Sequence, residues 1–235
     1  ILGAQNVIMA ALSNNVKKVI ALSTDKAVNP INLYGATKLA SDKLFVSANN
    51  FGGAKTKFSV VRYGNVVGSR ASVVPLFEKL LKAGSKYLPI TDDKMTRFWI
   101  TINQGIKLVD DAFQDMRGGE IYIPKIPSIK IIDLAKAMAP SVKQKVIGIR
   151  PGEKVHEMLT SKDESSYVIK FKHYYIVAPN YLSTKSIKKY FKNYHGEGGK
   201  KVDNDFEYNS GTNEHFLNIK EIKKLNQLNL INDTL

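Results

Sequence analysis

The sequence predicts an α/β protein built on a mostly parallel sheet that is flanked by helices. Two observations indicate this class. Short runs of β-branched and apolar residues alternate along the chain with longer segments whose apolar residues recur at helical spacing. Strands that alternate with helices form parallel sheets, because each helix returns the chain to the start of the next strand. In such sheets ligands bind at the carboxyl ends of the strands, so polar residues that follow a predicted strand are the first candidates for a functional site.

The predicted elements can be placed in order along the chain. Apolar residues at helical spacing predict a helix over residues 2–12, and the run Val16–Leu22 predicts a buried strand. A second helix is expected from about Tyr34 to Asn50. Further strands are predicted at Phe58–Arg62, Glu120–Pro124, Lys145–Ile149 and Tyr167–Val177, and further helices at 73–83 and Thr101–Met116. In the last of these helices Thr101 is the expected N-cap, and Gln104 is placed to complete a capping box.

The composition excludes several classes of protein. Hydrophobic residues make up 43% of the 235 residues and charged residues 24%, which argues against a disordered chain. Cysteine is absent, which excludes disulfides, thiolate metal sites and cysteine nucleophiles. It is also compatible with a reducing compartment, so we expect a cytoplasmic protein. No apolar run approaches the ~20 residues of a membrane span, and no His or carboxylate spacing suggests a metal site.

The formal net charge of +14 raises the alternative of a nucleic-acid-binding protein. The excess is almost entirely lysine, scattered along the chain, whereas recognition of base edges favours arginine. We therefore expect no nucleic-acid partner, and we favour an enzyme that uses an anionic substrate.

The most informative segment joins a predicted strand to a predicted helix. Tyr34 and Lys38 are four residues apart, so their side chains share one face of the helix. An ammonium group favours the phenolate form of a neighbouring tyrosine, so such a pair can supply a base. The spacing alone is common, and its ordinary outcome is an exposed lysine beside a half-buried tyrosine. A hydroxyl, a carboxyl and an amine in Ser23-Thr24-Asp25-Lys26, just after the strand, make a catalytic site the better interpretation.

This segment resembles the active-site segment of the inverting UDP-N-acetylglucosamine 4,6-dehydratases. These are members of the extended short-chain dehydrogenase/reductase family, and they open the pseudaminic acid pathway that supplies flagellin glycosylation. The similarity continues in order along nearly the whole chain, through Val60–Arg70, Met95–Thr101, Ile123–Ser128, Ile149–Glu157 and Asp205–Tyr208. It departs at Ala71, where such enzymes are expected to have glycine. Membrane-anchored retaining relatives usually carry methionine at the position of Tyr34, so the resemblance favours the soluble inverting type.

The resemblance implies a partial Rossmann-type doubly wound parallel sheet with a smaller α/β substrate-binding domain. Residues 1–67, with 98–125, would form the remainder of the dinucleotide-binding domain. Residues 68–97 and 126–235 would form the UDP-sugar domain and a C-terminal tail, mobile beyond about Ser183. The first residues have no signal-peptide pattern and resemble the middle of a helix, so the chain is expected to start inside a domain. The glycine-rich fingerprint is not found, so we expect residues 1–235 alone to be inactive.

The resemblance also implies the roles of the catalytic residues. Tyr34 would remove the proton of the sugar C4 hydroxyl, with Lys38 tuning Tyr34 and holding the cofactor ribose. Lys26 would take the C5 proton, and Asp25 would act as the acid that helps the C6 hydroxyl leave as water. Thr24 would orient a substrate hydroxyl. The expected cofactor is NADP, with NAD as the alternative.

Further residues are implied as ligands for the cofactor and the nucleotide. Tyr63, Asn65 and Val66 would lie near the nicotinamide, with Asn65 also contacting the substrate. Arg97 and Arg150 would clamp the diphosphate of UDP-N-acetylglucosamine, a role suited to a guanidinium fork. Glu153 would accept from the uridine ribose hydroxyls. Without the surrounding motifs, surface salt bridges would be the better interpretation of these three charged residues.

Three hypotheses about the function of the protein remain open at this point. The first is the inverting 4,6-dehydratase, expected to be a homo-oligomer when full length. The second is another nucleotide-sugar epimerase or dehydratase of the same superfamily. The third is an inert, truncated nucleotide-binding module. His156, within one of the matched segments, is expected to be structural.

Overall fold

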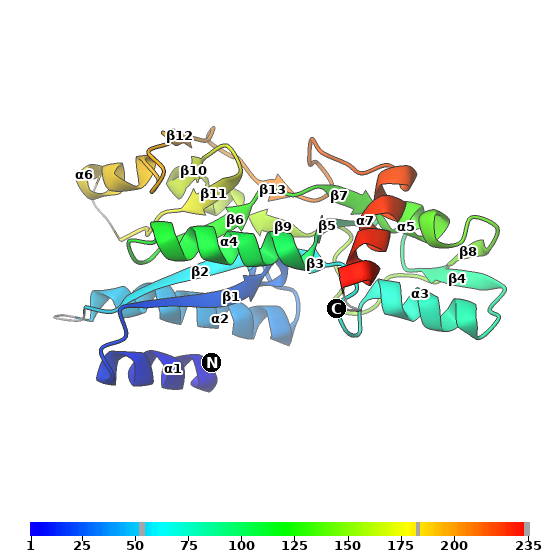
Figure 1. The fold of residues 1–235 in the computed structure, drawn as a ribbon, viewed down its shortest axis with the longest axis horizontal. Helices are drawn as coiled ribbons and strands as arrows, with labels where there is room; N and C mark the ends of the chain where they lie inside the picture. Colours follow the sequence, from blue (N-terminus) through cyan, green and yellow to red (C-terminus); the bar gives the residue numbers. More distant parts are fainter. Residues whose placement is uncertain (52–54, 182–183, 233–235) are drawn as a thin grey trace. The chain divides into compact units, whose positions relative to one another are not determined.

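The computed structural model describes residues 1–51, 55–181 and 184–232, which form two compact units (Figure 1). Unit 1 comprises Ile1–Tyr63, Ile106–Lys125 and Met158–Tyr208, and unit 2 comprises Gly64–Gly105, Ile126–Glu157 and Asn209–Leu235. The sequence resemblance divides the chain into a dinucleotide-binding domain and a UDP-sugar domain, and this division by ligand stays a prediction. The compact units have different bounds, since 98–105 belongs to unit 2 and 158–208 to unit 1. The second difference arises because strands from 168–177 extend the sheet of unit 1.

The sheet of unit 1 confirms the predicted α/β class. Three strands, β1 (Lys18–Thr24), β2 (Lys57–Tyr63) and β6 (Ile121–Pro124), pair in parallel. The sheet then continues through antiparallel neighbours, in the order β1-β2-β6-β11-β10-β12. The added strands are β10 (Val168–Lys170), β11 (Tyr174–Val177) and β12 (Lys200–Lys201).

Two strand predictions in this unit were wrong in part. The segment Tyr167–Val177 is two antiparallel strands, β10 and β11, and Phe171 N donates to Tyr174 O across the turn between them. The apolar pattern is the same on both sides of the reversal, so it gives no sign of the turn.

The strand predicted at Val16–Leu22 is confirmed as β1, but it is not buried as expected. Strand β1 pairs only with β2 among the described strands, and the Leu22 side chain is 51% exposed.

Helices cover both faces of the unit 1 sheet, as a doubly wound arrangement requires. Helix α2 (Leu33–Ser47) packs on β1 and β2, with Phe45 against Phe58, and α1 (Leu2–Ser13) packs on α2. Helix α4 (Ile102–Asp115) packs through Leu108 and Ala112 into a cluster with Val61 from the other face of β2. Successive residues of a strand point to opposite faces, which explains how neighbouring β2 residues serve two helices.

The predicted start of α4 is confirmed. Thr101 N donates to Gln104 Oε1 (2.9 Å), and Gln104 N donates to Thr101 Oγ1 (3.2 Å). These reciprocal bonds satisfy two backbone donors that the first turn of a helix leaves without partners.

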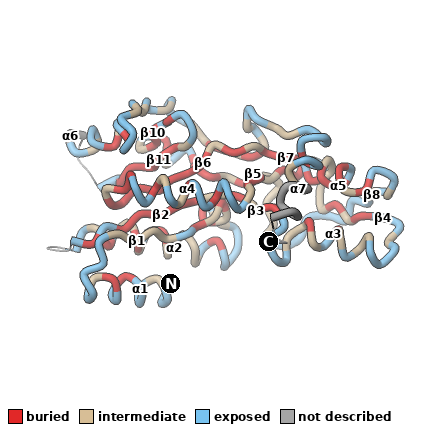
Figure 2. The backbone as a smooth tube through the Cα atoms, viewed as in Figure 1, coloured by how far each residue is buried: buried red, intermediate tan, exposed pale blue. Residues whose placement is uncertain are grey.

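In its described residues unit 2 contains two small sheets and three helices that lie wholly within it. Strand β5 (Thr96–Ile100) is parallel to β3 (Asn65–Val66) and antiparallel to β7 (Ser128–Lys130), and β4 (Tyr87–Ile90) is parallel to β8 (Lys143–Val146). The helices are α3 (Val73–Lys82), α5 (Ile131–Met138) and α7 (Ile219–Asn232). A further pair, β9 (Met158–Thr160) and β13 (Tyr208–Asn209), forms a two-stranded sheet that belongs to unit 1 except for Asn209. Buried backbone, red in Figure 2, follows the central strands of each unit.

The segment after Ser183 is not a loose tail in its described part. It carries α6 (Thr184–Ile187), β12 and α7, with Tyr190 buried in unit 1 and Ile222 buried in unit 2. The Tyr190 hydroxyl donates to the carbonyl of Gly118 (2.9 Å). The Lys- and Asn-rich composition of this segment predicted mobility. Apolar residues that stand between the polar ones, such as Tyr190 and Ile222, are buried instead.

A fully buried arginine ties several segments of unit 1 together. Arg62 Nη1 donates to the Leu159 carbonyl (2.9 Å) and to Glu164 Oε2 (3.1 Å). Arg62 Nη2 lies 3.5 Å from Asp42 Oδ2 on α2. Burial raises the pKa of Asp42, and the positive charge of Arg62 opposes that rise. The two carboxylates therefore depend on one guanidinium for their charge balance.

Replacing this arginine tests that dependence. Arg62→Met keeps an apolar stem but leaves Asp42 and Glu164 without their cation, and the free energy of unfolding should fall by about 3–5 kcal/mol. The matched control is Arg70→Met, at an exposed arginine, which should stay within ~0.5 kcal/mol of the parent protein. Urea unfolding followed by circular dichroism measures both. A loss below ~1 kcal/mol for Arg62→Met would contradict this view of the network.

Candidate active site

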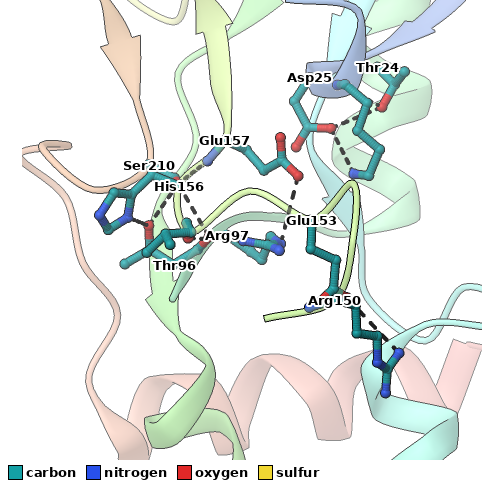
Figure 3. Close-up of polar contacts among 11 residues, drawn as sticks. Thr24, Asp25, Thr96, Arg97, Arg150, Glu153, His156, Glu157 and Ser210 are labelled. Atoms are coloured by element: carbon teal, nitrogen blue, oxygen red, sulfur yellow. Dashed lines mark hydrogen bonds and ion pairs between the residues drawn. The ribbon is translucent and has the colours of Figure 1, made fainter. Parts of the chain in front are cut away.

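The turn after β1 holds a buried carboxylate between two polar neighbours. Thr24 ends β1 and caps the short 3₁₀ helix η1 (Asp25–Ala27), with its Oγ1 accepting from Lys26 N. Asp25 Oδ1 accepts from Thr24 Oγ1 (2.9 Å), as Figure 3 shows, and also from Lys26 Nζ (3.0 Å). Asp25 is fully buried, and its second oxygen, Oδ2, has no hydrogen-bond partner within the described residues. A buried polar atom without a partner is costly, which makes Oδ2 a natural position for a group from a ligand.

The start of α2 lies in close contact with this turn. Asn32 caps the helix by accepting from Gly35 N (2.8 Å). A Cβ atom at Gly35 would lie 2.3 Å from the carbonyl oxygen of Lys26 and 2.9 Å from Pro30 Cβ. Only glycine therefore allows the helix to approach the turn so closely. Tyr34, the residue before Gly35, is held beside the turn in the same way.

Tyr34 and Lys38 lie on the first turns of α2, as predicted. The Tyr34 side chain is 55% exposed, and its charge contributes, after burial, to raising the pKa of Tyr63. The Lys38 ammonium donates to the carbonyl of Leu22 (2.7 Å), near the carboxyl end of β1. This bond fixes the lysine at the sheet, while its effect on Tyr34 stays a prediction.

Unit 1 therefore gathers six of the predicted residues at the carboxyl ends of β1 and β2. Thr24 and Tyr63 are directly paired in the register of these two strands, and Tyr63 ends β2. The six residues are Thr24, Asp25, Lys26, Tyr34, Lys38 and Tyr63. This is the edge at which α/β sheets bind ligands.

The remaining predicted residues belong to unit 2. Asn65 and Val66 form β3, and the buried Asn65 Oδ1 has no hydrogen-bond partner in the part of the chain that the structure describes. Gly64, just before them, packs against Phe98, since a Cβ there would lie 2.4 Å from Phe98 Cβ. Asn65 thus offers an acceptor to a ligand, in keeping with its predicted role.

Arg97, on β5, is held by backbone and carboxylate groups. Its Nη1 donates to the carbonyls of Thr96 (2.7 Å) and Val155 (3.1 Å), and its Nε lies 3.9 Å from Glu157 Oε1 (Figure 3). The side chain is 11% exposed. A guanidinium fixed on one side keeps its other donors oriented, which suits recognition of a phosphate group.

Arg150 and Glu153 lie together on one turn. Arg150 Nη1 is 4.0 Å from Glu153 Oε1, the Arg150 side chain is 58% exposed, and Arg150 N donates to Glu153 Oε2 (3.4 Å). This contact is the surface ion pair that was the alternative interpretation, and such pairs contribute little to stability. The predicted roles of both residues in nucleotide binding stay predictions.

Ser210 was not predicted to matter, yet it organises the surroundings of Arg97. Its Oγ accepts from Glu157 N (2.9 Å) and lies 2.7 Å from Thr96 Oγ1, which lies 2.8 Å from His156 Nδ1. His156 is thus bound into a network within unit 2, which agrees with the structural role expected for it. No local sequence pattern could have indicated Ser210, because its partners are far away along the chain.

The expected glycine-like position at Ala71 is visible in the backbone. Ala71 has φ +59°, in the left-handed region that glycine adopts at little cost.

Among the described residues no cluster of His, Cys, Asp or Glu could hold a metal ion, and no helix among them has the length and apolar character needed to span a membrane.

The fold and the site together define a class of protein. A Rossmann-type sheet whose flanking helix carries Tyr34 and Lys38, beside a polar turn at the strand end, is the arrangement of the extended short-chain dehydrogenase/reductases. The family model described as "Polysaccharide biosynthesis protein" matches residues 1–179. The chain therefore belongs to this polysaccharide biosynthesis family.

Two curated relatives illustrate the similarity. The chain is 56% identical over 233 residues to the UDP-N-acetylglucosamine 4,6-dehydratase (inverting) of Campylobacter jejuni, covering 99% of this chain and 68% of that protein. It is 41% identical over 230 residues to the UDP-glucose 4-epimerase of Rickettsia akari, covering 96% of this chain and 65% of that one.

Two solved structures share the fold. Pen from Bacillus thuringiensis is 34% identical with a TM-score of 0.84, over 98% of this chain and 68% of that chain. DesIV, a dTDP-glucose 4,6-dehydratase from Streptomyces venezuelae solved with NAD bound, is 21% identical with a TM-score of 0.58, over 65% of this chain and 54% of its own.

The close contact between α2 and the turn generates a test. Gly35→Ala should lower the free energy of unfolding by roughly 1–3 kcal/mol, because the new methyl group overlaps the Lys26 carbonyl. This loss should appear even though alanine favours a helix over glycine by about 1 kcal/mol. The matched control is Gly105→Ala on α4, where a Cβ would meet no atom within 4 Å. Urea unfolding should show destabilisation at position 35 and none at 105. Equal effects at both positions would contradict the proposed contact.

Proposed function

We propose that this chain carries the catalytic residues of a UDP-N-acetylglucosamine 4,6-dehydratase that inverts C5. The observation that carries the proposal is the state of Asp25. One of its oxygens is held by Thr24 and Lys26, while the other is buried without a partner among the described residues. The 56% identical relative named for this reaction supports the same assignment.

The reaction oxidises C4 of the sugar to a ketone, removes the C6 hydroxyl as water and leaves a methyl group at C6. A nicotinamide dinucleotide held at this site would supply the acceptor for the C4 hydride and its donor to C6, so none would be consumed. The residues of the chain move the protons. Tyr34 removes the proton of the C4 hydroxyl, since its side chain is accessible at the start of α2, the helix that packs on the catalytic turn.

Elimination of water needs a base at C5 and an acid at C6, and the Asp25–Lys26 pair supplies both. The ketone acidifies the C5 proton, and Lys26 takes it as a neutral amine. A proton on Asp25 belongs on Oδ2, because Oδ1 already accepts two hydrogen bonds. Asp25 gives this proton to the departing C6 hydroxyl. The step leaves a lysine ammonium beside a carboxylate, the pair seen at 3.0 Å, and transfer of the proton from Lys26 to Asp25 resets both groups.

Thr24 supports these two residues and binds the substrate. Its hydroxyl donates to Asp25 Oδ1 and its oxygen accepts one bond from Lys26 N, so the second lone pair of that oxygen can accept from a sugar hydroxyl. A proton from solvent then reaches C5 on the face opposite Lys26, which gives the inverted sugar.

The residues present fit a nicotinamide dinucleotide. Tyr34, Lys38 and Tyr63 in unit 1, with Asn65 and Val66 in unit 2, are the residues that would hold it. Asn65 Oδ1 is a buried acceptor without a partner in the described chain, which suits an amide donor. The DesIV structure contains NAD on this fold. For this chain we propose NADP, with NAD as the alternative.

Arg97, Arg150 and Glu153 are proposed to bind the nucleotide. Two arginines match the two phosphates, and the buried support of Arg97 gives it a fixed orientation. Glu153 is proposed to release its ion pair with Arg150 and to accept from the ribose hydroxyls.

Several finer proposals follow from the resemblance. The product would enter pseudaminic acid synthesis for flagellin glycosylation in the cytoplasm, and the full-length protein would be a homo-oligomer. Because no glycine-rich fingerprint occurs in residues 1–235, we propose that these residues alone bind the cofactor weakly and are inactive.

An exchange experiment separates the roles of Tyr34 and Lys26 in the full-length enzyme. The 4-keto-6-deoxy sugar that keeps the C5 configuration of the substrate, so that its C5 proton faces Lys26, is incubated in D₂O, and loss of that proton is followed by NMR. Tyr34→Phe should reduce formation of product from UDP-N-acetylglucosamine by ~10²-fold or more, but it should keep C5 exchange, because the ketone is already present. Lys26→Ala should lose both. Lys43→Ala, at an exposed lysine of α2, is the matched control. C5 exchange at the parent rate in Lys26→Ala would show that another residue is the base.

A further inference from the structure

A continuous chain of hydrogen bonds in unit 2 joins three segments that are distant in the sequence. It runs from the backbone of Glu157 to Ser210 (2.9 Å), from Ser210 to Thr96 (2.7 Å) and from Thr96 to the imidazole of His156 (2.8 Å), as Figure 3 shows. Thr96 and Ser210 are buried. Buried polar groups need partners, so the direction of each bond in this chain is constrained.

The Ser210 hydroxyl lies at the centre of this chain. Its Oγ accepts from Glu157 N, and its hydroxyl has two acceptors within reach, the Thr96 carbonyl (3.3 Å) and Thr96 Oγ1 (2.7 Å). Thr96 Oγ1 in turn exchanges a hydrogen bond with His156 Nδ1, which accepts or donates according to the tautomer of the ring. Burial, followed by the charge of Arg97, lowers the pKa of His156 and so favours the neutral ring.

The backbone is shaped to admit the imidazole ring. A Cβ atom at Gly211 would lie 2.7 Å from both Cγ and Nδ1 of His156. Glycine at this position therefore lets the ring lie directly against the chain. The contact fixes the ring by a second interaction that does not depend on its hydrogen bond.

The same chain surrounds the anchoring groups of Arg97. The Thr96 carbonyl accepts from Arg97 Nη1 (2.7 Å) and also from Ser210 Oγ (3.3 Å). The Val155 carbonyl and the Glu157 carboxylate, on either side of His156 in the sequence, make the other contacts to the guanidinium. A shift of the His156 ring would therefore move the groups that orient Arg97.

We propose that His156 is a positioning residue, which fixes Arg97 through Thr96 and Ser210 so that its free donors face a phosphate group of the ligand. The inference rests on the proposed role of Arg97 in binding the diphosphate. His156 itself does not touch the ligand, so its effect on affinity should exist only while Arg97 is present.

A double-mutant cycle on the full-length enzyme tests this dependence, with UDP as the probe and titration calorimetry as the measurement. Arg97→Ala should weaken UDP binding about 10- to 100-fold, the range for a hydrogen bond to a charged group. His156→Leu should weaken it about 3- to 10-fold in the parent protein and have no further effect in the Arg97→Ala protein. His156→Asn places an amide group, which can accept or donate a hydrogen bond, near the position of Nδ1, so it should restore most of the affinity.

The outcomes separate this inference from the proposed function. An equal effect of His156→Leu with and without Arg97 would overturn the positioning role, as would failure of His156→Asn to rescue binding. If Arg97→Ala leaves UDP affinity unchanged, the proposed role of Arg97 fails and the inference falls with it, while turnover of UDP-N-acetylglucosamine still tests the reaction. If His156→Leu does not fold, Gly211→Ala displaces the ring with the histidine retained and should show the same dependence on Arg97.

Discussion

The contact between the first turn of α2 and the turn after β1 is the constraint on which the catalytic half of the molecule depends. Gly35 permits it, because any side chain would overlap the Lys26 carbonyl. The contact holds the start of α2, which carries Tyr34, against the turn that carries Asp25 and Lys26, and the bond from Lys38 to Leu22 holds the same helix at the strand end. One helix thus carries the proposed base for oxidation, and one turn carries the proposed acid and base for elimination. Their separation in the sequence follows from the crossover from strand to helix.

Each unit contains an arginine with little or no exposure, and the two arginines differ in how completely their guanidinium groups are enclosed. In unit 1 Arg62, on β2, forms ion pairs with Asp42, on α2, and with Glu164, and so ties α2 to β2. In unit 2 Arg97 is anchored on one side by carbonyls and a carboxylate, which leaves its charge available. A fully enclosed guanidinium stabilises the fold, whereas a partly open one is suited to a ligand.

The sequence predicts the local structure of the segment from β1 to α2 well because its signals are local. A strand, a polar turn and a helix with Tyr34 and Lys38 lie within a few turns of chain, and the capping box at Thr101 involves residues only three apart. The reversal between β10 and β11 is not predictable from the apolar pattern, because that pattern is the same in both directions. The bond between Thr96 and Ser210 joins residues 114 positions apart and leaves no local trace. Arg150 and Glu153 are close in the sequence, but their local pattern is ambiguous. The same two residues can form an ordinary surface ion pair or a ligand-binding site.

The most direct test of the account follows the hydrogen atom at C4. UDP-N-acetylglucosamine labelled with deuterium at C4 is converted by the full-length enzyme, and the product is analysed by NMR. A 4,6-dehydratase with the assigned residues moves the label within the same sugar, so deuterium should appear in the C6 methyl group beside a C4 ketone. Return of the label to C4 with inverted configuration, as in a 4-epimerase, would contradict the account.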